Sequence, residues 1–357
     1  MRVLLTGAAG FIGAHVGGAL REAGHEVVGV DAMLPLAHGA HTQPPVDIRR
    51  LDVRDADALS GLLTGVDVVC HQAAMVGAGV DAADAPSFAA HNDLGTAVLL
   101  AAMAQTGVRR LVLASSMVVY GSGRYTCAAH GVVEPAGRTK ADLDAGVFDS
   151  ACPHCGRRVQ WALVDEDAPL RPRSTYAASK LAQENYALAW TLATGGSVTA
   201  LRYHNVYGSH MPRDTPYSGV AAIFRSALEA GQPARVFEDG GQARDFVHVA
   251  DVAQANRLAV EATLGGFQPF NVCSGTPVTV GEAAAILARA YGGSEPTVTG
   301  EYRAGDVRHV VADPARAARE LGFLAAVGPQ RGITEFAHAP LRSVPESWRK
   351  FPGAPNG

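Results

Sequence analysis

Tyr176 and Lys180 are four residues apart in the stretch YAASK, a spacing that puts both side chains on one face of a helix. A lysine ammonium beside a tyrosine lowers the pKa of the phenol, so such a pair can act as a base near neutral pH. This pattern is common and means little by itself. Here it follows residues 111–120 (LVLASSMVVY), an apolar strand that runs into two serines. The context predicts an acid–base site where the strand and the helix meet.

Three glycines follow the first apolar segment, in the stretch TGAAGFIG. Glycines at this spacing allow a tight turn, close approach of the backbone to a pyrophosphate, and close packing of the next helix, whose N-terminus attracts the anion. The sequence therefore predicts a dinucleotide site formed by Gly7, Gly10, Phe11, Ile12 and Gly13.

Asp31 lies at the tip of the second predicted strand. A carboxylate there can accept hydrogen bonds from an adenosine ribose, and it would repel a 2′-phosphate. No arginine follows it immediately, so Asp31 favours NAD over NADP as the cofactor. The alternative is an ordinary surface aspartate.

Three of the five cysteines lie between residues 120 and 176, in a segment that is long for a simple strand-to-helix connection. They form a C-x₂-H half and a C-x₂-C half with 21 residues between them, made by Cys127, His130, Cys152 and Cys155. Four such ligands can surround a metal tetrahedrally, which predicts a closed structural zinc site rather than a catalytic one. A surface loop with free cysteines is the alternative.

The elements that must position these residues alternate between strand and helix. Apolar segments predict strands at residues 2–5, 26–30, 47–51, 66–70, 110–114 and 197–201. Ile12, Val16 and Leu20 recur every four residues and predict a helix that ends at Gly24. The fold class is therefore α/β, a Rossmann-type doubly wound parallel sheet with ligands at the carboxyl ends of its strands. Residues 35–45 are expected to form a loop, with His38 and His41 in solvent.

Beyond about residue 203 the alternation gives way to shorter segments broken by Gly and Pro. We expect an NAD-binding domain over residues 1–202, with the cysteine-bearing segment as a zinc-ribbon-like insertion at about 122–165. A smaller substrate domain would cover 203–357, with part of 245–262 returning to the first domain.

Composition excludes several classes of protein. Thirty basic residues against 34 acidic ones, with arginines at most in isolated pairs, argue against a nucleic-acid partner. No apolar run approaches the ~20 residues needed to cross a bilayer. We expect a cytoplasmic protein with no membrane partner.

Many stretches, in order along most of the chain, resemble the extended short-chain dehydrogenase/reductases, specifically the nucleotide-sugar epimerase/dehydratase family. They are TGAAGFIG, LDV at 51–53, HQAA at 71–74, SSMVVYG at 115–121, YAASK, RYHNVYG at 202–208, RDFVH at 244–248 and GDVR at 305–308. The SSxxVYG pattern, a following Y-x-C-x-x-H-G element and FEDG at 237–240 resemble the dTDP-L-rhamnose 4-epimerase-like branch.

The resemblance implies roles for the residues that match these motifs. Ser116 would hydrogen-bond the reacting sugar hydroxyl, with Tyr176 as the base and Lys180 as its electrostatic partner, and the last two would also contact the cofactor. Asp52 and its neighbour Val53 would meet the adenine end of NAD, and Ala73 would line the cofactor site.

The resemblance also implies a nucleotide-diphosphate sugar, a dTDP- or UDP-hexose, as the partner. Asn205, Arg244 and Arg308 would hold it, and arginine suits a charge-assisted bond to a diphosphate. Family resemblance alone implies a homodimer through the helices near residues 92–106 and 176–194.

The reaction is inferred from two positions. Dehydratases of the family place Asp and Glu where this chain has Met117 and Val118. Without those carboxylates, what remains is hydride removal, rotation of a keto sugar and hydride return, which is epimerisation at C4. The alternatives are a nucleotide-sugar oxidoreductase and a non-catalytic NAD-binding sensor.

Overall fold

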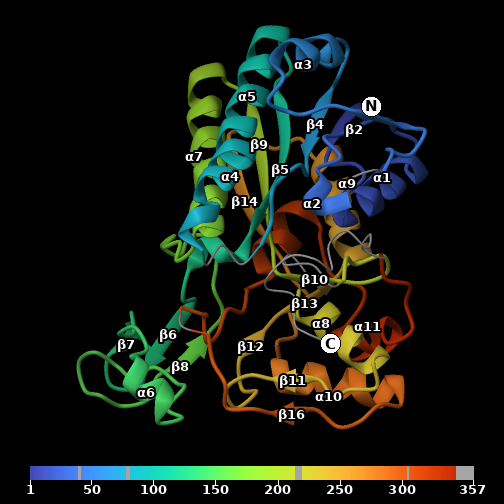
Figure 1. Cartoon of the computed structure of the whole chain (residues 1–357). Helices are drawn as coiled ribbons and strands as arrows, with labels where there is room; N and C mark the ends of the chain where they lie inside the picture. The colour runs from blue at the N-terminus through green and yellow to red at the C-terminus, as the bar shows by residue number, and fades with distance from the viewer. Residues whose placement is uncertain (39–41, 78–80, 214–218, 304, 343–357) are drawn as a thin grey trace.

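The computed structural model describes residues 1–38, 42–77, 81–213, 219–303 and 305–342. Within these residues the central sheet has seven strands, all paired in parallel, in the order β14-β9-β5-β4-β1-β2-β3 (Figure 1). The strands are β1 (Arg2–Thr6), β2 (Glu26–Asp31), β3 (Ile48–Arg50), β4 (Val68–His71), β5 (Arg110–Ser116), β9 (Ser197–Tyr203) and β14 (Phe267–Val272). The predicted fold class is confirmed, and β14 is the one strand of this sheet that the sequence analysis did not anticipate.

Helices cover both faces of the sheet. They are α1 (Phe11–Glu22) and α9 (Val249–Glu261) on one face, and α3 (Ala56–Leu63), α5 (Gly95–Thr106) and α7 (Thr175–Thr194) on the other. Successive side chains of a strand point to opposite faces. On β1, Val3 and Leu5 therefore join the core under α1 and α9, whereas Leu4 joins the core under α3, α5 and α7. None of the helices in the described part of the chain is long and apolar enough to cross a bilayer.

The helix predicted from the fourfold spacing is α1. Val16 and Leu20 on it are fully buried, and the chain leaves it through Gly24 at φ +81°. The loop predicted at 35–45 is partly wrong, because a short helix, α2 (Pro35–His38), occupies its start. Proline at the first position of a helix explains this, since its φ is already helical and it needs no amide partner there. His41 lies outside the described residues.

The second half of the chain builds a smaller unit with its own apolar core. It contains short strand pairs and three helices: β10 (Asn205–Tyr207) with β13 (Phe246–His248), β11 (Arg235–Val236) with β16 (Thr297–Val298), β12 (Ala243–Arg244) with β15 (Val278–Thr279), α8 (Val220–Glu229), α10 (Val280–Tyr291) and α11 (Pro329–Phe336). Three later elements leave this unit, and one of them is the turn η4 (Ala317–Leu321), whose Ala317 and Leu321 join the core under α1 and α9. α9 packs against α1, and β14 forms the edge of the main sheet beside β9.

The cysteine-bearing segment projects from the carboxyl end of β5 and lies beside β12, at the lower left of Figure 1. It is a three-stranded antiparallel sheet with one short helix: β7 (Gly131–Val133), β6 (Arg124–Cys127), β8 (Gln160–Ala162) and α6 (Lys140–Asp144). Five of its buried side chains form a separate small cluster: Tyr125, Cys127, Val133, Cys152 and Val159. We call residues 122–165 the insertion.

Candidate active site

The turn between β1 and α1 is so tight that two of its glycines have no room for a side chain. A Cβ on Gly13 would lie 2.0 Å from the carbonyl oxygen of Gly7, and one on Gly7 would lie 2.7 Å from the amide nitrogen of Ala73. Gly10 begins α1 without a side-chain cap. The amides of the first turn, including those of Phe11 and Ile12, have no partner within the helix and can bind an anion. This geometry fits a dinucleotide pyrophosphate.

Asp31 ends β2 beside this turn. Its carboxylate accepts hydrogen bonds from the amides of Ala9 (3.0 Å) and Met33 (2.8 Å), and it pairs with His38 at 3.3 Å. Burial alone raises the pKa of Asp31, but the His38 contact and the two amides outweigh burial and lower it. The carboxylate is therefore a fixed anion at the sheet edge. His38, which the sequence analysis placed in solvent, is a buried partner of Asp31.

The other predicted cofactor residues follow β3 and β4 along the same edge of the sheet. Asp52 is held by the Arg54 guanidinium through bonds of 2.6–3.1 Å, which lower the pKa of its carboxyl group. Val53 is buried against the start of α5, where a Cβ on Gly95 would come within 2.9 Å of it. The backbone amide of Ala73 donates to Thr6 Oγ1 at 3.2 Å. Arg54 is a neighbour that the sequence analysis missed.

The structure brings the three predicted catalytic residues together. β5 ends at Ser116, whose side chain lies close enough to the Tyr176 phenol to lower its pKa. Lys180 Nζ donates to the carbonyl oxygen of Ala114 at 2.9 Å, which ties α7 to β5. α7 begins at Thr175 because the Ser174 hydroxyl caps its N-terminus. The roles of these residues stay predictions.

Burial sets the ionisation of this group in the free protein. It raises the pKa of Tyr176 to about 12, against the lowering effect of Ser116, and it lowers the pKa of Lys180 to about 8, against the raising effect of Glu184. The phenol is therefore protonated at neutral pH, and it becomes a usable base only with added positive charge beside it.

One helical turn beyond Lys180, a buried ion pair between Glu184 and Arg202 packs next to the predicted catalytic residues. Glu184 bonds the Arg202 guanidinium at 2.7 Å and 3.0 Å and accepts a hydrogen bond from Ser115 at 2.5 Å. Arg202 also donates to the Tyr120 hydroxyl at 2.9 Å. Both charged side chains are 3% exposed. No pattern in the sequence predicted this pair, although Glu184 lies at helical spacing from Lys180.

The predicted substrate residues lie along β10, β12 and the segment after β16. Asn205 Oδ1 is buried and, among the described residues, has no hydrogen-bond partner, so it is available to a ligand hydroxyl. Arg244 Nη1 donates to the carbonyl oxygen of Arg308 at 2.8 Å, so these two arginines are neighbours. The Arg308 guanidinium itself is bound by three carboxylates, those of Asp149, Glu238 and Asp239.

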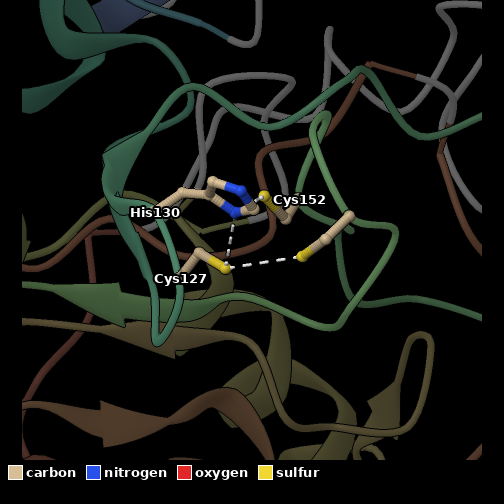
Figure 2. Close-up of side chains that lie close together, drawn as sticks. Cys127, His130 and Cys152 are labelled. Carbon is tan, nitrogen blue, oxygen red and sulfur yellow. Dashed lines mark hydrogen bonds between the residues drawn. The ribbon is translucent and has the colours of Figure 1, made fainter.

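The four predicted metal ligands lie together in the insertion (Figure 2), with their ligand atoms all within 4.8 Å of one another. Cys127 Sγ is 3.7 Å from Cys155 Sγ, and His130 Nδ1 is 3.6 Å from Cys127 Sγ and 3.5 Å from Cys152 Sγ. Zinc–ligand bonds of about 2.3 Å to sulfur and 2.0 Å to nitrogen give tetrahedral edges of about 3.8 Å and 3.5 Å. The spacing fits a tetrahedral metal and is far too long for a disulfide bond.

At Cys127 the thiolate form, which metals bind, is favoured. The amide of Ala129 and the side chain of His130 lower the pKa of Cys127 to about 6. At Cys155 the Arg157 backbone has a lowering effect, but desolvation and the side chains of Cys127 and Cys152 outweigh it, and the pKa is raised. The donor set and its geometry therefore both suit zinc.

Known proteins resemble this chain over nearly its whole length. A dTDP-L-rhamnose 4-epimerase of Burkholderia thailandensis is 33% identical over 343 residues, 94% of this chain and 93% of the relative. A dTDP-glucose 4,6-dehydratase of an Actinoplanes species is 29% identical over 94% of this chain and 96% of the relative. The UDP-glucose 4-epimerase of Thermus thermophilus, solved with NAD, has a TM-score of 0.72 at 32% identity, over 94% of this chain and 98% of that one.

The sequence pattern of one family covers most of the chain. It matches residues 3–136 and 149–273 and so includes both the glycine turn and the helix of Tyr176 and Lys180. Residues 137–148, within the insertion, lie between the two matched stretches. The chain belongs to the NAD dependent epimerase/dehydratase family.

Proposed function

We propose that this protein binds NAD and inverts the configuration at C4 of a nucleotide-diphosphate hexose, with a dTDP- or UDP-sugar as substrate. The observation that carries the proposal is the Ser116, Tyr176 and Lys180 group beside a glycine turn with no room for side chains. Relatives named as dTDP-L-rhamnose and UDP-glucose 4-epimerases support it.

The chain's own residues would move the proton. Tyr176 would take the proton of the sugar C4 hydroxyl, Ser116 would orient that hydroxyl, and the Lys180 ammonium would stabilise the phenolate. Bound NAD supplies the hydride acceptor and later donor, and its nicotinamide adds the positive charge that a tyrosine with a pKa of about 12 needs.

Met117 and Val118 distinguish this reaction from dehydration. They lie in the short helical turn η3 (Met117–Tyr120), directly after Ser116, and their side chains are apolar. Loss of water from the sugar would need an acid and a base at C5 and C6, which these side chains cannot supply. This favours epimerisation over the dehydratase activity for which other relatives are named.

The test is incubation with a panel of dTDP- and UDP-hexoses, with inversion at C4 followed by proton NMR. Tyr176→Phe should abolish turnover while leaving NAD bound, because it removes only the proton carrier. NADH released in proportion to product would instead support an oxidoreductase, and water loss would support a dehydratase. A protein that binds NAD but turns over none of these sugars would support the sensor.

A zinc ion at Cys127, His130, Cys152 and Cys155 is the second part of the proposal. The edges of 3.5–3.7 Å between ligand atoms support it. The ion would be structural, because the insertion has only a small core. Elemental analysis of protein purified without a metal-affinity tag should find one zinc per chain and none in a Cys152→Ser/Cys155→Ser variant. Equal zinc in both proteins would contradict the site.

We also propose a homodimer through the outer surface of α5 and α7. Exposed apolar side chains support it: Leu94 directly precedes α5, and Tyr186, Leu188 and Leu192 lie on α7. Leu192→Glu should halve the mass found by light scattering. Leu324→Glu, at another highly exposed leucine that lies on neither helix, should leave the mass unchanged.

We propose the predicted domain division as well, with 1–202 binding NAD and 203–357 binding the sugar nucleotide, apart from 343–357, which lie outside the described residues. The location of α9 in the core of the main sheet supports the expected return of part of 245–262, and β14 extends that return. The cytoplasmic location stays a prediction.

A further inference from the structure

A series of ion pairs joins the insertion to the smaller unit built by the second half of the polypeptide, which we call the substrate unit. Arg138 Nη1 donates to Glu238 Oε1 at 2.5 Å, Arg308 Nη1 donates to Glu238 Oε2 at 2.8 Å, and Arg308 Nε donates to Asp149 Oδ1 at 3.0 Å. This series of ion pairs starts and ends in the insertion, at Arg138 and Asp149. Its two middle residues, Glu238 and Arg308, belong to the substrate unit. We call these four residues the clamp.

The clamp is buried, and other polar contacts between the two parts lie beside it, among them Tyr302 with Asp144 and His309 with Asp149. Its four side chains are at most 15% exposed. The apolar cluster of the insertion is separate from the core of the substrate unit. A cavity of about 650 Å³, lined in part by Trp161, Gly241 and His309, lies between the two parts. Because the two apolar clusters are separate, the buried charged side chains help to determine the relative position of the two parts.

The two carboxylates at the ends of the Arg308 guanidinium differ. Asp149 binds the Nε edge and is largely buried. Asp239 binds the Nη1 and Nη2 fork, at 2.7 Å and 2.9 Å, and its side chain is 51% exposed. A diphosphate binds arginine through this same fork. An incoming diphosphate would therefore compete with Asp239 for the fork and leave the contact with Asp149 intact.

We propose that Asp149 and Arg138 of the insertion are positioning residues for the nucleotide diphosphate, and that Asp239 occupies the Arg308 fork until the diphosphate displaces it. The inference rests on the proposed nucleotide-sugar function. Asp149 bonds the Nε edge of Arg308, and Arg138 bonds Glu238, which itself bonds Arg308. The carbonyl oxygen of Arg308 in turn accepts a hydrogen bond from Arg244. The insertion thereby orients both arginines. Arg138 lies in the stretch 137–148, between the two parts that match the family pattern.

The experiment is calorimetric titration of the NAD-bound protein with UDP and dTDP, beside UMP and dTMP. Asp149→Asn should weaken binding of the better diphosphate about tenfold, within the range found for coupled contacts. Asp239→Asn should strengthen it severalfold, because the competing carboxylate is gone. Both monophosphates should change less. Arg158→Gln is the matched control, because Arg158 also pairs with Asp149 but is exposed.

Zinc content and NAD affinity check that each variant is folded. If Asp149→Asn fails this check, Arg138→Gln carries the test, with the same expected loss. The inference would be overturned if Asp149→Asn and Asp239→Asn changed the diphosphate affinity in the same direction. It would also be overturned if Arg158→Gln weakened diphosphate binding as much as Asp149→Asn does. A parent protein that binds these diphosphates without epimerising any sugar would refute the proposed reaction alone. One that binds neither diphosphate would overturn both.

Discussion

Replacing Glu184 by Gln would leave the buried Arg202 guanidinium without its counter-charge. Glu184 and Arg202 are each 3% exposed and share bonds of 2.7 Å and 3.0 Å. Breaking a buried pair by neutralising one partner costs about 3–5 kcal/mol. Arg202 keeps the Tyr120 hydroxyl and the carbonyl oxygen of Glu166 as acceptors. We therefore expect the lower end, about 3 kcal/mol.

That loss of unfolding free energy corresponds to a decrease in melting temperature. An unfolding entropy of about 2.1 cal/mol/K per residue gives about 0.75 kcal/mol/K for a chain of this length, so Glu184→Gln should lower the Tm by about 4 °C. The assay is scanning calorimetry with the same saturating NAD in every sample, because bound ligand also shifts the Tm.

Glu335→Gln is the matched control. Glu335 pairs with Arg331 at helical spacing, but both side chains are exposed, and such pairs contribute only a few tenths of a kcal/mol. Its Tm should stay within 1 °C of the parent. A Glu184→Leu/Arg202→Met variant should recover part of the loss, because an apolar pair carries no desolvation cost. Equal shifts in Glu184→Gln and Glu335→Gln would refute the reasoning.

Three further outcomes follow from the structure. Asp31→Asn should reduce the preference for NAD over NADP, because it removes the anion that would repel a 2′-phosphate; unchanged relative affinities in a titration would count against this role. Cys152→Ser/Cys155→Ser should weaken UDP or dTDP binding more than NAD binding, since Arg138 and Asp149 of the clamp lie in the insertion and the glycine turn does not; equal losses of both would speak for general unfolding. Burial lowers the pKa of His71 to about 3, against about 6.5 when unfolded, so the unfolded chain takes up the proton first and stability falls as pH drops from about 6.5 toward 3. Urea unfolding of His71→Asn at pH 7 and pH 5 should show a difference smaller than the parent's by about 2 kcal/mol.

Local patterns predicted the parts of the site that are determined within a few residues. The spacing of Gly7 and Gly13 reflects backbone contacts that a Cβ would prevent, so the turn can be inferred from the letters alone. Tyr176 and Lys180 share a helix face for the same local reason. The C-x₂-H and C-x₂-C halves could be predicted to lie together, because four ligands of one metal ion must surround it at fixed distances.

Contacts between distant segments could not be inferred in this way. Nothing near Asp149 indicates that its partner is Arg308, because the pairing depends on how the insertion docks on another unit. Likewise, the sequence of β14 resembles the other short segments after residue 203. Its pairing with β9 in the main sheet is visible only in the structure. Arg308 was expected to face a diphosphate, and no local pattern indicated the three carboxylates around it.

The order of the sheet also has a consequence for synthesis on the ribosome. The glycine turn, Asp31, Ser116, Tyr176 and Lys180 all precede the end of β9, whereas β14, which covers the open edge of β9, follows about 60 residues later. At roughly 5–20 residues per second, β9 emerges as an uncovered edge for about 3–12 s before its neighbour is made. An uncovered apolar edge is a template for pairing with other chains. A nascent chain stalled in this window would carry the NAD-binding and Tyr/Lys residues and still be prone to aggregation.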